Sequence, residues 1–325
     1  MELRIGTLRG LDACASARGT FSVLALDHRN NLRRILGPDD PDAVTHDEMV
    51  AFKRTVVRAL GDTATGVLLD AEVGAAQAIA DGSLPARSGL IVALEASGYV
   101  GPSTARISQL LPGWSVAQAR RLGADAVKLL LYYHPDAPNA ADQERLLIDV
   151  AEACVDADMP LFLEPLSYSI DETIPTLTGD ARRDVVVRTA HRLTALGGDV
   201  LKAEFPYDTS VTDRGRWREA CDELDAATSV PWVLLSAGVD DATFESQTKV
   251  ACEAGASGVL VGRSVWGPSA TLPSASREEW LATEGRGLLQ RLVGLVDDLG
   301  RPWRERSTHL LEAEPGAEWY LDYPA

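Results

Sequence analysis

Two lysines and a glutamate interrupt apolar runs in the middle of the chain. Lys128 lies within AVKLLLYY, Glu164 within LFLEPL and Lys202 within DVLKAEF. Charged side chains inside apolar segments are costly unless they are paired or used chemically, and lysine is among the residues least often buried. An ion pair would explain one such lysine. Two lysines on either side of a glutamate favour a chemical role.

This combination predicts covalent catalysis at a carbonyl group. A neighbouring ammonium and partial removal from water both disfavour the charged form of a lysine and leave a neutral amine. A neutral amine can attack a ketone and form a Schiff base, and a nearby carboxylate can move the protons that carbinolamine loss and C–C cleavage require. Lys128, Glu164 and Lys202 are therefore candidate catalytic residues.

The composition makes these lysines easy to pick out, because arginine is the usual cation of this chain. Of the 31 basic residues, only four are lysines: Lys53, Lys128, Lys202 and Lys249. Lys53 and Lys249 fall in amphipathic segments that predict helices, so we expect both to be exposed to solvent.

The overall charge and the chain ends narrow the class of protein. The 325 residues carry a net charge of −17, which argues against nucleic acid or anionic lipid as a main partner. The four cysteines show no CxxC or metal-binding spacing and are expected to be free thiols. The chain has neither an apolar leader nor a run of about 18 apolar residues, so we expect a soluble cytoplasmic protein and no membrane association.

Short apolar segments alternate with longer amphipathic ones along the chain. The nearly continuous apolar segments, which predict parallel strands buried on both faces, are 21–28, 66–72, 89–96, 125–133, 160–168, 199–206, 231–238 and 257–264. The amphipathic segments, which predict helices, are 46–61, 141–158, 180–198, 213–229, 242–255 and 277–300.

Eight such strands predict a single (β/α)8 TIM barrel over residues 1–300, with a short N-terminal lead-in. A doubly wound sheet is the alternative. Residues 301–325 form a tail that we expect to pack on the barrel or on a dimer partner.

The barrel would bring the candidate residues to one end, because active sites of this fold lie at the C-terminal ends of the strands. Lys128 and Lys202 fall on alternate strands, which contribute side chains to the same layer, so they are expected to approach each other across Glu164. The first strand ends in Asp27 and His28, and Arg29 follows them.

The loops after the seventh and eighth strands predict a phosphate site. LSAGVDD supplies Ser236 and Gly238, and VGRSVWG supplies Gly262 and Arg263. Glycine allows close backbone approach, amide N–H groups bind oxygens, and arginine adds bidentate charge. These two loops form the recurrent phosphate site of TIM barrels, and ordinary tight turns with a surface arginine are the alternative.

The sequence resembles the class I aldolases of the tagatose-1,6-bisphosphate aldolase family, with the sulfofructose-phosphate aldolases as close relatives. The resemblance runs from about residue 20 to residue 267 and is carried by LALDHRNNLRR, DAVKLLLYYHPD, PLFLEPLSY, DVLKAEFP, LLSAGVDDATF and GVLVGRSVWG. It implies a carbon–carbon lyase that uses no metal or other cofactor and releases dihydroxyacetone phosphate from a sugar phosphate. It also implies a homodimer.

The resemblance implies a role for each matching residue. Lys202 would form the Schiff base and Glu164 would carry protons. Lys128 would contact the substrate oxygen near the breaking bond and tune Lys202, and Asp27 would bind the C3 and C4 hydroxyls or assist proton transfer. The phosphate of the dihydroxyacetone phosphate half would be bound by Ser236, Gly238, Gly262 and Arg263.

The end of the first strand departs from the family pattern. Asp27-His28-Arg29 stands where the family usually has Asp-Gln-Arg, in a loop that faces the distal part of the substrate in that family. His28 and Arg29 are therefore candidate substrate-binding residues, and we expect that a histidine here can carry a charge near neutral pH. Whether the distal group of the substrate is a 6-phosphate, a 6-sulfonate or another group therefore stays open. A phosphoketose aldolase of inositol breakdown, which shares the Asp-His-Arg start, is an alternative.

Two other classes of function also stay open. A metal-dependent barrel aldolase would need clustered ligands, and only His28 and His134 among the histidines fall at strand ends. A Mg²⁺ site formed by Asp70, Glu72 and Glu95 is the remaining form of that alternative. The other class is a non-catalytic phosphosugar-binding protein on the same scaffold, although binding alone needs no Schiff-base lysine.

Overall fold

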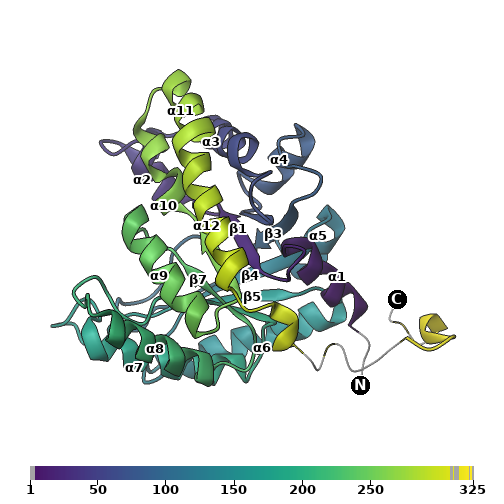
Figure 1. The fold of residues 1–325 in the computed structure, drawn as a ribbon, viewed down its shortest axis with the longest axis vertical. Helices are drawn as coiled ribbons and strands as arrows, with labels where there is room; N and C mark the ends of the chain where they lie inside the picture. The colour runs from purple at the N-terminus through teal and green to yellow at the C-terminus, as the bar shows by residue number, and fades with distance from the viewer. Residues whose placement is uncertain (1–3, 308–309, 311–314, 322, 324–325) are drawn as a thin grey trace.

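Eight parallel strands close into a barrel in sequence order (Figure 1). The computed structural model describes residues 4–307, 310, 315–321 and 323. The strands are β1 (Phe21–Ala25), β2 (Gly66–Leu69), β3 (Gly89–Ala93), β4 (Ala126–Tyr132), β5 (Leu161–Leu166), β6 (Val200–Ala203), β7 (Trp232–Leu235) and β8 (Gly258–Val261). Each strand pairs with the next, and β8 pairs with β1. The predicted (β/α)8 barrel is confirmed.

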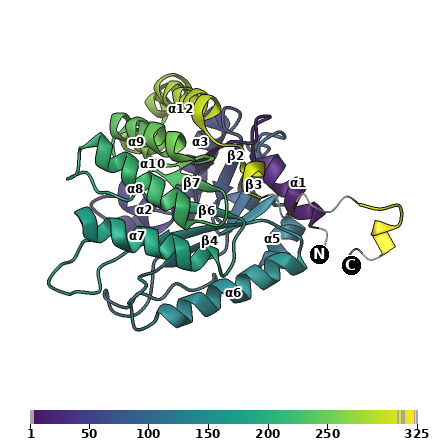
Figure 2. The same cartoon turned by 60° about the horizontal axis from the view of Figure 1, so that its bottom comes forward.

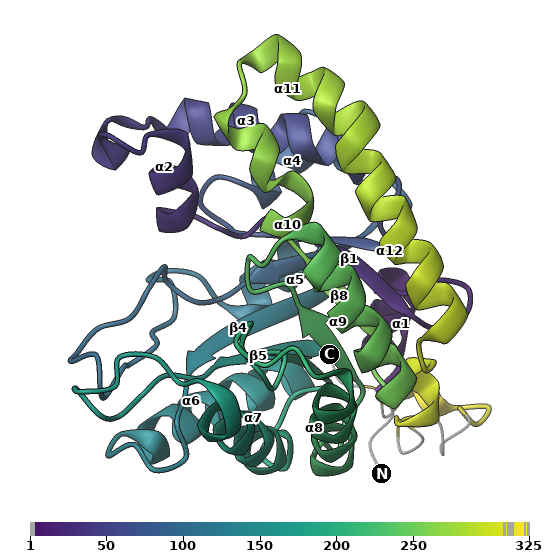
Figure 3. The same ribbon diagram turned by 60° about the vertical axis from the view of Figure 1, so that its left-hand side comes forward.

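Helices cover the outside of the barrel (Figures 1 and 2). Five agree with the predicted segments: α3 (His46–Leu60), α6 (Ala140–Asp156), α7 (Gly179–Thr194), α8 (Arg214–Ala227) and α9 (Asp241–Ala254). The segment predicted as one helix over 277–300 is instead α11 (Ser274–Trp280), a π-helical turn (Leu281–Gly285) and α12 (Arg286–Leu299). Figure 3 shows α12 running beside α9. None of the described helices has the length and apolar content needed to cross a membrane.

Several short helices have no counterpart in the sequence prediction. They are α1 (Ile5–Cys14), α2 (Asn30–Leu36), α4 (Ala75–Ala80), α5 (Val116–Leu122) and α10 (Arg263–Trp266). Short 3-10 turns span Pro41–Ala43, Gly267–Thr271, Trp303–Glu305 and Trp319–Leu321. One to three turns give too few repeats for a clear helical periodicity.

The N-terminal end of the barrel is closed by apolar packing. Phe21 and Phe162 meet edge to face inside it, with ring centroids 5.6 Å apart, and Leu11 of α1 joins the same cluster. The helix comes this close because Gly10 has no side chain, since a Cβ there would lie 2.2 Å from the backbone oxygen of Asp125. The charged side chains inside the barrel therefore gather at the opposite, C-terminal end.

The first part of the C-terminal tail packs on the barrel. Trp303 is fully buried, and its backbone N–H donates to the backbone oxygen of Gly19 at 2.8 Å. Farther along, Tyr320 is exposed, whereas the Tyr323 hydroxyl contacts Asp158. A dimer contact through this tail stays a prediction.

Candidate active site

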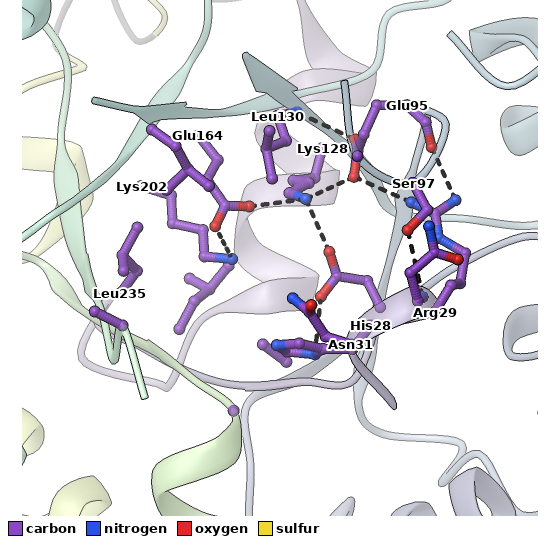
Figure 4. Close-up of a pocket in the computed structure, with 18 of the residues that line it drawn as sticks. His28, Arg29, Asn31, Glu95, Ser97, Lys128, Leu130, Glu164, Lys202 and Leu235 are labelled. Atoms are coloured by element: carbon purple, nitrogen blue, oxygen red, sulfur yellow. Dashed lines mark hydrogen bonds and ion pairs between the residues drawn. The ribbon is translucent and has the colours of Figure 1, made fainter. Parts of the chain in front are cut away.

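A pocket of about 650 Å³ opens at the C-terminal ends of the strands (Figure 4). The ends of β1 and of β3 to β8 supply its walls. Most of the predicted site residues line it: Asp27, His28, Arg29, Lys128, Glu164, Lys202, Ser236, Gly262 and Arg263. The barrel therefore brings together residues that lie far apart in the sequence.

Glu164 lies between the two candidate lysines (Figure 4). One of its carboxylate oxygens is 2.8 Å from Nζ of Lys128 and the other is 2.8 Å from Nζ of Lys202. The three side chains come from β5, β4 and β6, and all are buried. The expectation that the two lysines approach each other across Glu164 is confirmed.

Lys128 is surrounded by carboxylates. Its Nζ is 2.8 Å from Asp27, 2.7 Å from Glu95 and 2.8 Å from Glu164. Lys128 donates hydrogen bonds to Asp27 and Glu95, and Glu164 lies within ion-pair distance of the same ammonium. Burial lowers the pKa of Lys128, but the three carboxylates outweigh burial and hold that pKa well above its ordinary value. Lys128 is therefore a fixed positive charge without a free lone pair.

Lys202 is held less tightly. Its Nζ contacts Glu164, and among the described residues no second carboxylate lies within ion-pair distance. Burial opposes the shift, but the charges of Lys128 and Lys202 hold the pKa of Glu164 below its ordinary value. Glu164 is thus a carboxylate at neutral pH and lies against Lys202. Of the two lysines, Lys202 therefore has the fewer carboxylate contacts, one against three for Lys128.

His28 is neutral, so the expectation that it can be charged near neutral pH is wrong. Its ring packs edge to face against Trp266, with centroids 5.2 Å apart. Burial lowers the pKa of His28 to about 4, and nearby Asp27 offsets only part of that shift. The neutral imidazole forms part of the pocket wall. The sequence does not indicate this contact, because His28 follows β1 whereas Trp266 follows β8, at the other end of the barrel sequence.

Arg29 forms an ion pair and a hydrogen bond with two glutamates at the edge of the pocket. Its Nη1 donates to Glu72 at 3.0 Å and to the backbone oxygen of Glu95 at 2.8 Å. The other end of Glu95 binds Lys128 and accepts the backbone N–H of Leu130 at 3.1 Å (Figure 4). Glu95 therefore joins Arg29 to the lysine cluster. From the sequence, Glu95 is a candidate metal ligand only, although it lies within an apolar segment as Glu164 does.

The three carboxylates of the suggested Mg²⁺ site do not converge on one point. Asp70 pairs with Lys53, Glu72 pairs with Arg29, and Glu95 pairs with both Lys128 and Arg29. Within the part of the chain that the structure describes, no group of three or more His, Cys, Asp or Glu side chains is placed to hold a metal ion. These carboxylates instead form ion pairs with lysine and arginine side chains.

Lys53 is buried, so the prediction that it is exposed is wrong. Its side chain is 2% exposed and forms an ion pair with Asp70, which follows β2. Lys53 lies on the same face of α3 as Met49 and Val56, both of which are buried. Lys249 on α9 is 55% exposed, as predicted.

The loops after β7 and β8 meet at one side of the pocket. The backbone N–H of Gly262 donates to Oγ of Ser236 at 3.4 Å. Gly238 has a φ of +79°, and a Cβ there would lie 3.0 Å from Cζ of Arg263. Glycine thus lets the guanidinium lie against the loop, so Gly238 supports Arg263 rather than lining the pocket. Among the described residues, no carboxylate lies within ion-pair distance of Arg263.

Comparison with known proteins shows that this chain is similar to aldolases. The sequence profile of the DeoC/LacD family of aldolases matches residues 21–267. The tagatose 1,6-diphosphate aldolase 2 of Streptococcus pyogenes serotype M1 is 31% identical over 90% of this chain and 95% of its own length. The tagatose 1,6-diphosphate aldolase of Streptococcus agalactiae serotype V is 31% identical over 91% of this chain and 97% of its own length.

Solved structures share the fold. A Schiff base-forming fructose-1,6-bisphosphate aldolase superposes with a TM-score of 0.59 and 21% identity, covering 91% of this chain and 100% of that one. An archaeal fructose-1,6-bisphosphate aldolase, with its catalytic lysine bound to a carbinolamine intermediate, superposes with a TM-score of 0.59 and 20% identity, covering 91% of this chain and 99% of that one.

The barrel, its lysine and carboxylate cluster and these relatives define an aldolase, which is a carbon–carbon lyase. The chain belongs to the DeoC/LacD family of aldolases.

Proposed function

We propose that this protein is a Schiff-base aldolase. It reversibly cleaves a phosphorylated ketose of the tagatose-1,6-bisphosphate type into dihydroxyacetone phosphate and an aldehyde. The observation that supports this proposal best is Glu164 between Lys128 and Lys202, each 2.8 Å from a different carboxylate oxygen. The names of the relatives support the choice of substrate class.

Lys202 is the nucleophile in this proposal. Glu164 takes a proton from its ammonium, and the neutral amine attacks C2 of the open-chain ketose. A proton then moves from the attacking nitrogen to the oxygen, which gives the carbinolamine. Glu164 returns its proton to the carbinolamine hydroxyl, which leaves as water, and an iminium ion forms. The iminium accepts the electron pair of the C3–C4 bond when that bond breaks. Protonation of the resulting enamine and hydrolysis release dihydroxyacetone phosphate and regenerate Lys202.

Asp27 and Lys128 act on the oxygen beside the breaking bond. Asp27 takes the proton of the C4 hydroxyl as the aldehyde forms. Burial raises the pKa of Asp27, but the charge of Lys128 more than offsets it and holds that pKa well below its ordinary value, so Asp27 is ionised. Lys128 keeps its positive charge and stabilises negative charge that develops on the substrate oxygen.

Borohydride trapping with dihydroxyacetone phosphate, followed by peptide mass mapping, tests the proposal. We expect a reduced covalent adduct on the peptide that contains Lys202. An active enzyme without an adduct, or an adduct on Lys128 alone, would contradict it.

Two further measurements distinguish the alternative functions. Inhibition by EDTA would favour a metal-dependent aldolase, and tight sugar phosphate binding without turnover would favour a binding protein. A panel of tagatose bisphosphate, fructose bisphosphate and sulfofructose phosphate then identifies the distal group and the C4 configuration.

Replacing Arg263 with methionine is expected to weaken phosphate binding. The guanidinium lines the pocket beside Ser236 and Gly262, where it can bind phosphate by charge-assisted hydrogen bonds. Loss of such bonds corresponds to an increase in KM for the phosphorylated substrate of about 10-fold to 100-fold. Trapping with unphosphorylated dihydroxyacetone is the control, and it should proceed equally in both proteins. An equal loss with both ketones would contradict a role in phosphate binding.

A further inference from the structure

We propose that Lys53, a buried lysine outside the pocket, is a positioning residue for the aldol reaction. It acts through the loop after β2 on Arg29 and Glu95, which hold Lys128. This inference rests on the proposed Schiff-base function, and it adds a residue that touches neither substrate nor reacting atoms.

The ion pair between Lys53 and Asp70 is unusual for its place in the fold. Both side chains are buried, with exposures of 2% and 0%. The surrounding face of α3 is apolar and includes Phe52 and Val56. Replacing a buried ion pair with apolar residues of similar volume is often neutral or stabilising. Stability alone therefore gives little reason for a lysine here, and the contacts of Asp70 point to a second role.

Asp70 shapes the loop that follows β2. One carboxylate oxygen accepts the backbone N–H groups of Glu72 and Val73, at 2.9 and 2.8 Å, and the other binds Lys53. The backbone oxygen of Asp70 accepts the N–H of Ala75 at 2.8 Å. Lys53 thus fixes the rotation of the carboxylate, and the carboxylate fixes the turn that directs Glu72.

Glu72 connects this turn to the active site through Arg29 and Glu95. Its carboxylate binds Nη1 of Arg29 at 3.0 Å, and Nη2 of Arg29 lies 3.6 Å from the carboxylate of Glu95. The same oxygen of Glu95 is 2.7 Å from Nζ of Lys128. Figure 4 shows this inner part of the path, from Arg29 through Glu95 to Lys128. A displaced turn therefore displaces an anchor of Lys128.

Lys53 also interacts electrostatically with the active-site residues Asp27 and His28. Burial lowers the pKa of Lys53, and the charges of Asp70 and Asp27 oppose that shift. The charge of Lys53 in turn contributes to the low pKa of His28, which results mainly from burial. Lys53 is therefore close enough to Asp27 and His28 to influence both.

Four variants test the inference: Lys53→Met, Glu72→Gln, their combination, and Lys249→Met as a matched control on an exposed helix face. Borohydride trapping counts the competent sites in each preparation, and steady-state kinetics give kcat per trapped site and KM. We expect Lys53→Met to lower kcat per trapped site by about 10-fold to 100-fold, because small displacements of catalytic groups have effects of this size. KM should change by less than about twofold, because the phosphate loops follow other strands.

Glu72→Gln is expected to lower kcat per trapped site in the same direction. The double variant should be no slower than the slower single variant, because both substitutions interrupt one path. Lys249→Met should behave as the wild type. A purely structural role for Lys53 predicts fewer trapped sites with unchanged turnover per site, and that result would overturn the inference. Additive effects of the two substitutions would overturn it as well.

The design separates this inference from the proposed function. A wild-type enzyme that turns over without a trapped adduct contradicts the Schiff-base mechanism itself. A normal wild-type adduct together with full turnover per site in Lys53→Met contradicts only the positioning role. If Lys53→Met does not fold, Glu72→Gln decides, because Glu72 is 46% exposed and its amide is tolerated at the surface. Full turnover per site in that variant overturns the inference.

Discussion

Replacing Lys202 with methionine is expected to abolish the borohydride-trapped adduct and to lower turnover by at least about 10⁴-fold. Methionine fills the buried site with a side chain of similar length but offers no nucleophile. Lys128 cannot take over, because Asp27, Glu95 and Glu164 all lie within ion-pair distance of its ammonium and hold its pKa well above the ordinary value. The measurement is release of dihydroxyacetone phosphate together with mass mapping of the trapped protein.

Two controls make this result specific. Lys249→Met removes an exposed lysine from α9 and should leave both adduct and turnover unchanged. Chemical denaturation should show that Lys202→Met still folds, because Glu164 keeps its contact with Lys128. A variant that keeps its turnover, or that forms the adduct at another lysine, would show that Lys202 is not the Schiff-base residue.

The barrel and the lysine cluster were accessible from the sequence for the same physical reason. Strands covered on both faces are almost continuously apolar, so each charged residue within them stands out. Lys128, Glu164 and Lys202 were found in this way, and the alternation of strands around a barrel then placed them together. The contacts of Lys128 with Asp27 and Glu95 required the folded chain, because they join the ends of different strands.

Lys53 is buried although it was predicted to be exposed. It lies on the same helical stripe as Met49, Val56 and Leu60, so the periodicity of the segment indicated a buried position. The general rarity of buried lysines favours the opposite, exposed position, and at this residue that tendency does not hold. Its partner Asp70 comes from the end of another element, and no spacing in the sequence links the two. The neutral state of His28 has a different cause, because its packing against Trp266 is a tertiary contact that no sequence pattern indicates.

Replacing Lys128 with methionine is expected to lower the free energy of unfolding by about 3–5 kcal/mol near neutral pH. The reason is that Asp27, Glu95 and Glu164 then share a buried space without their common cation. Turnover should also fall by at least about 100-fold, because the fixed charge beside the breaking bond is lost. Denaturant unfolding measures the first effect, and turnover per trapped site measures the second independently of the folded fraction.

The pH dependence of this variant should have the opposite sign to that of the wild type. In the wild type, burial raises the pKa of Asp27 but Lys128 outweighs it, so the folded pKa lies well below the ordinary 3.8. Its contribution to stability is therefore present above about pH 4 and is lost only as the pH falls through the folded pKa. Without Lys128, burial is expected to raise the pKa of Asp27 above its unfolded value. The variant should then gain stability relative to the wild type as the pH falls from about 7 to about 5. An equal loss of stability at both pH values would contradict the role of Lys128 as the shared cation.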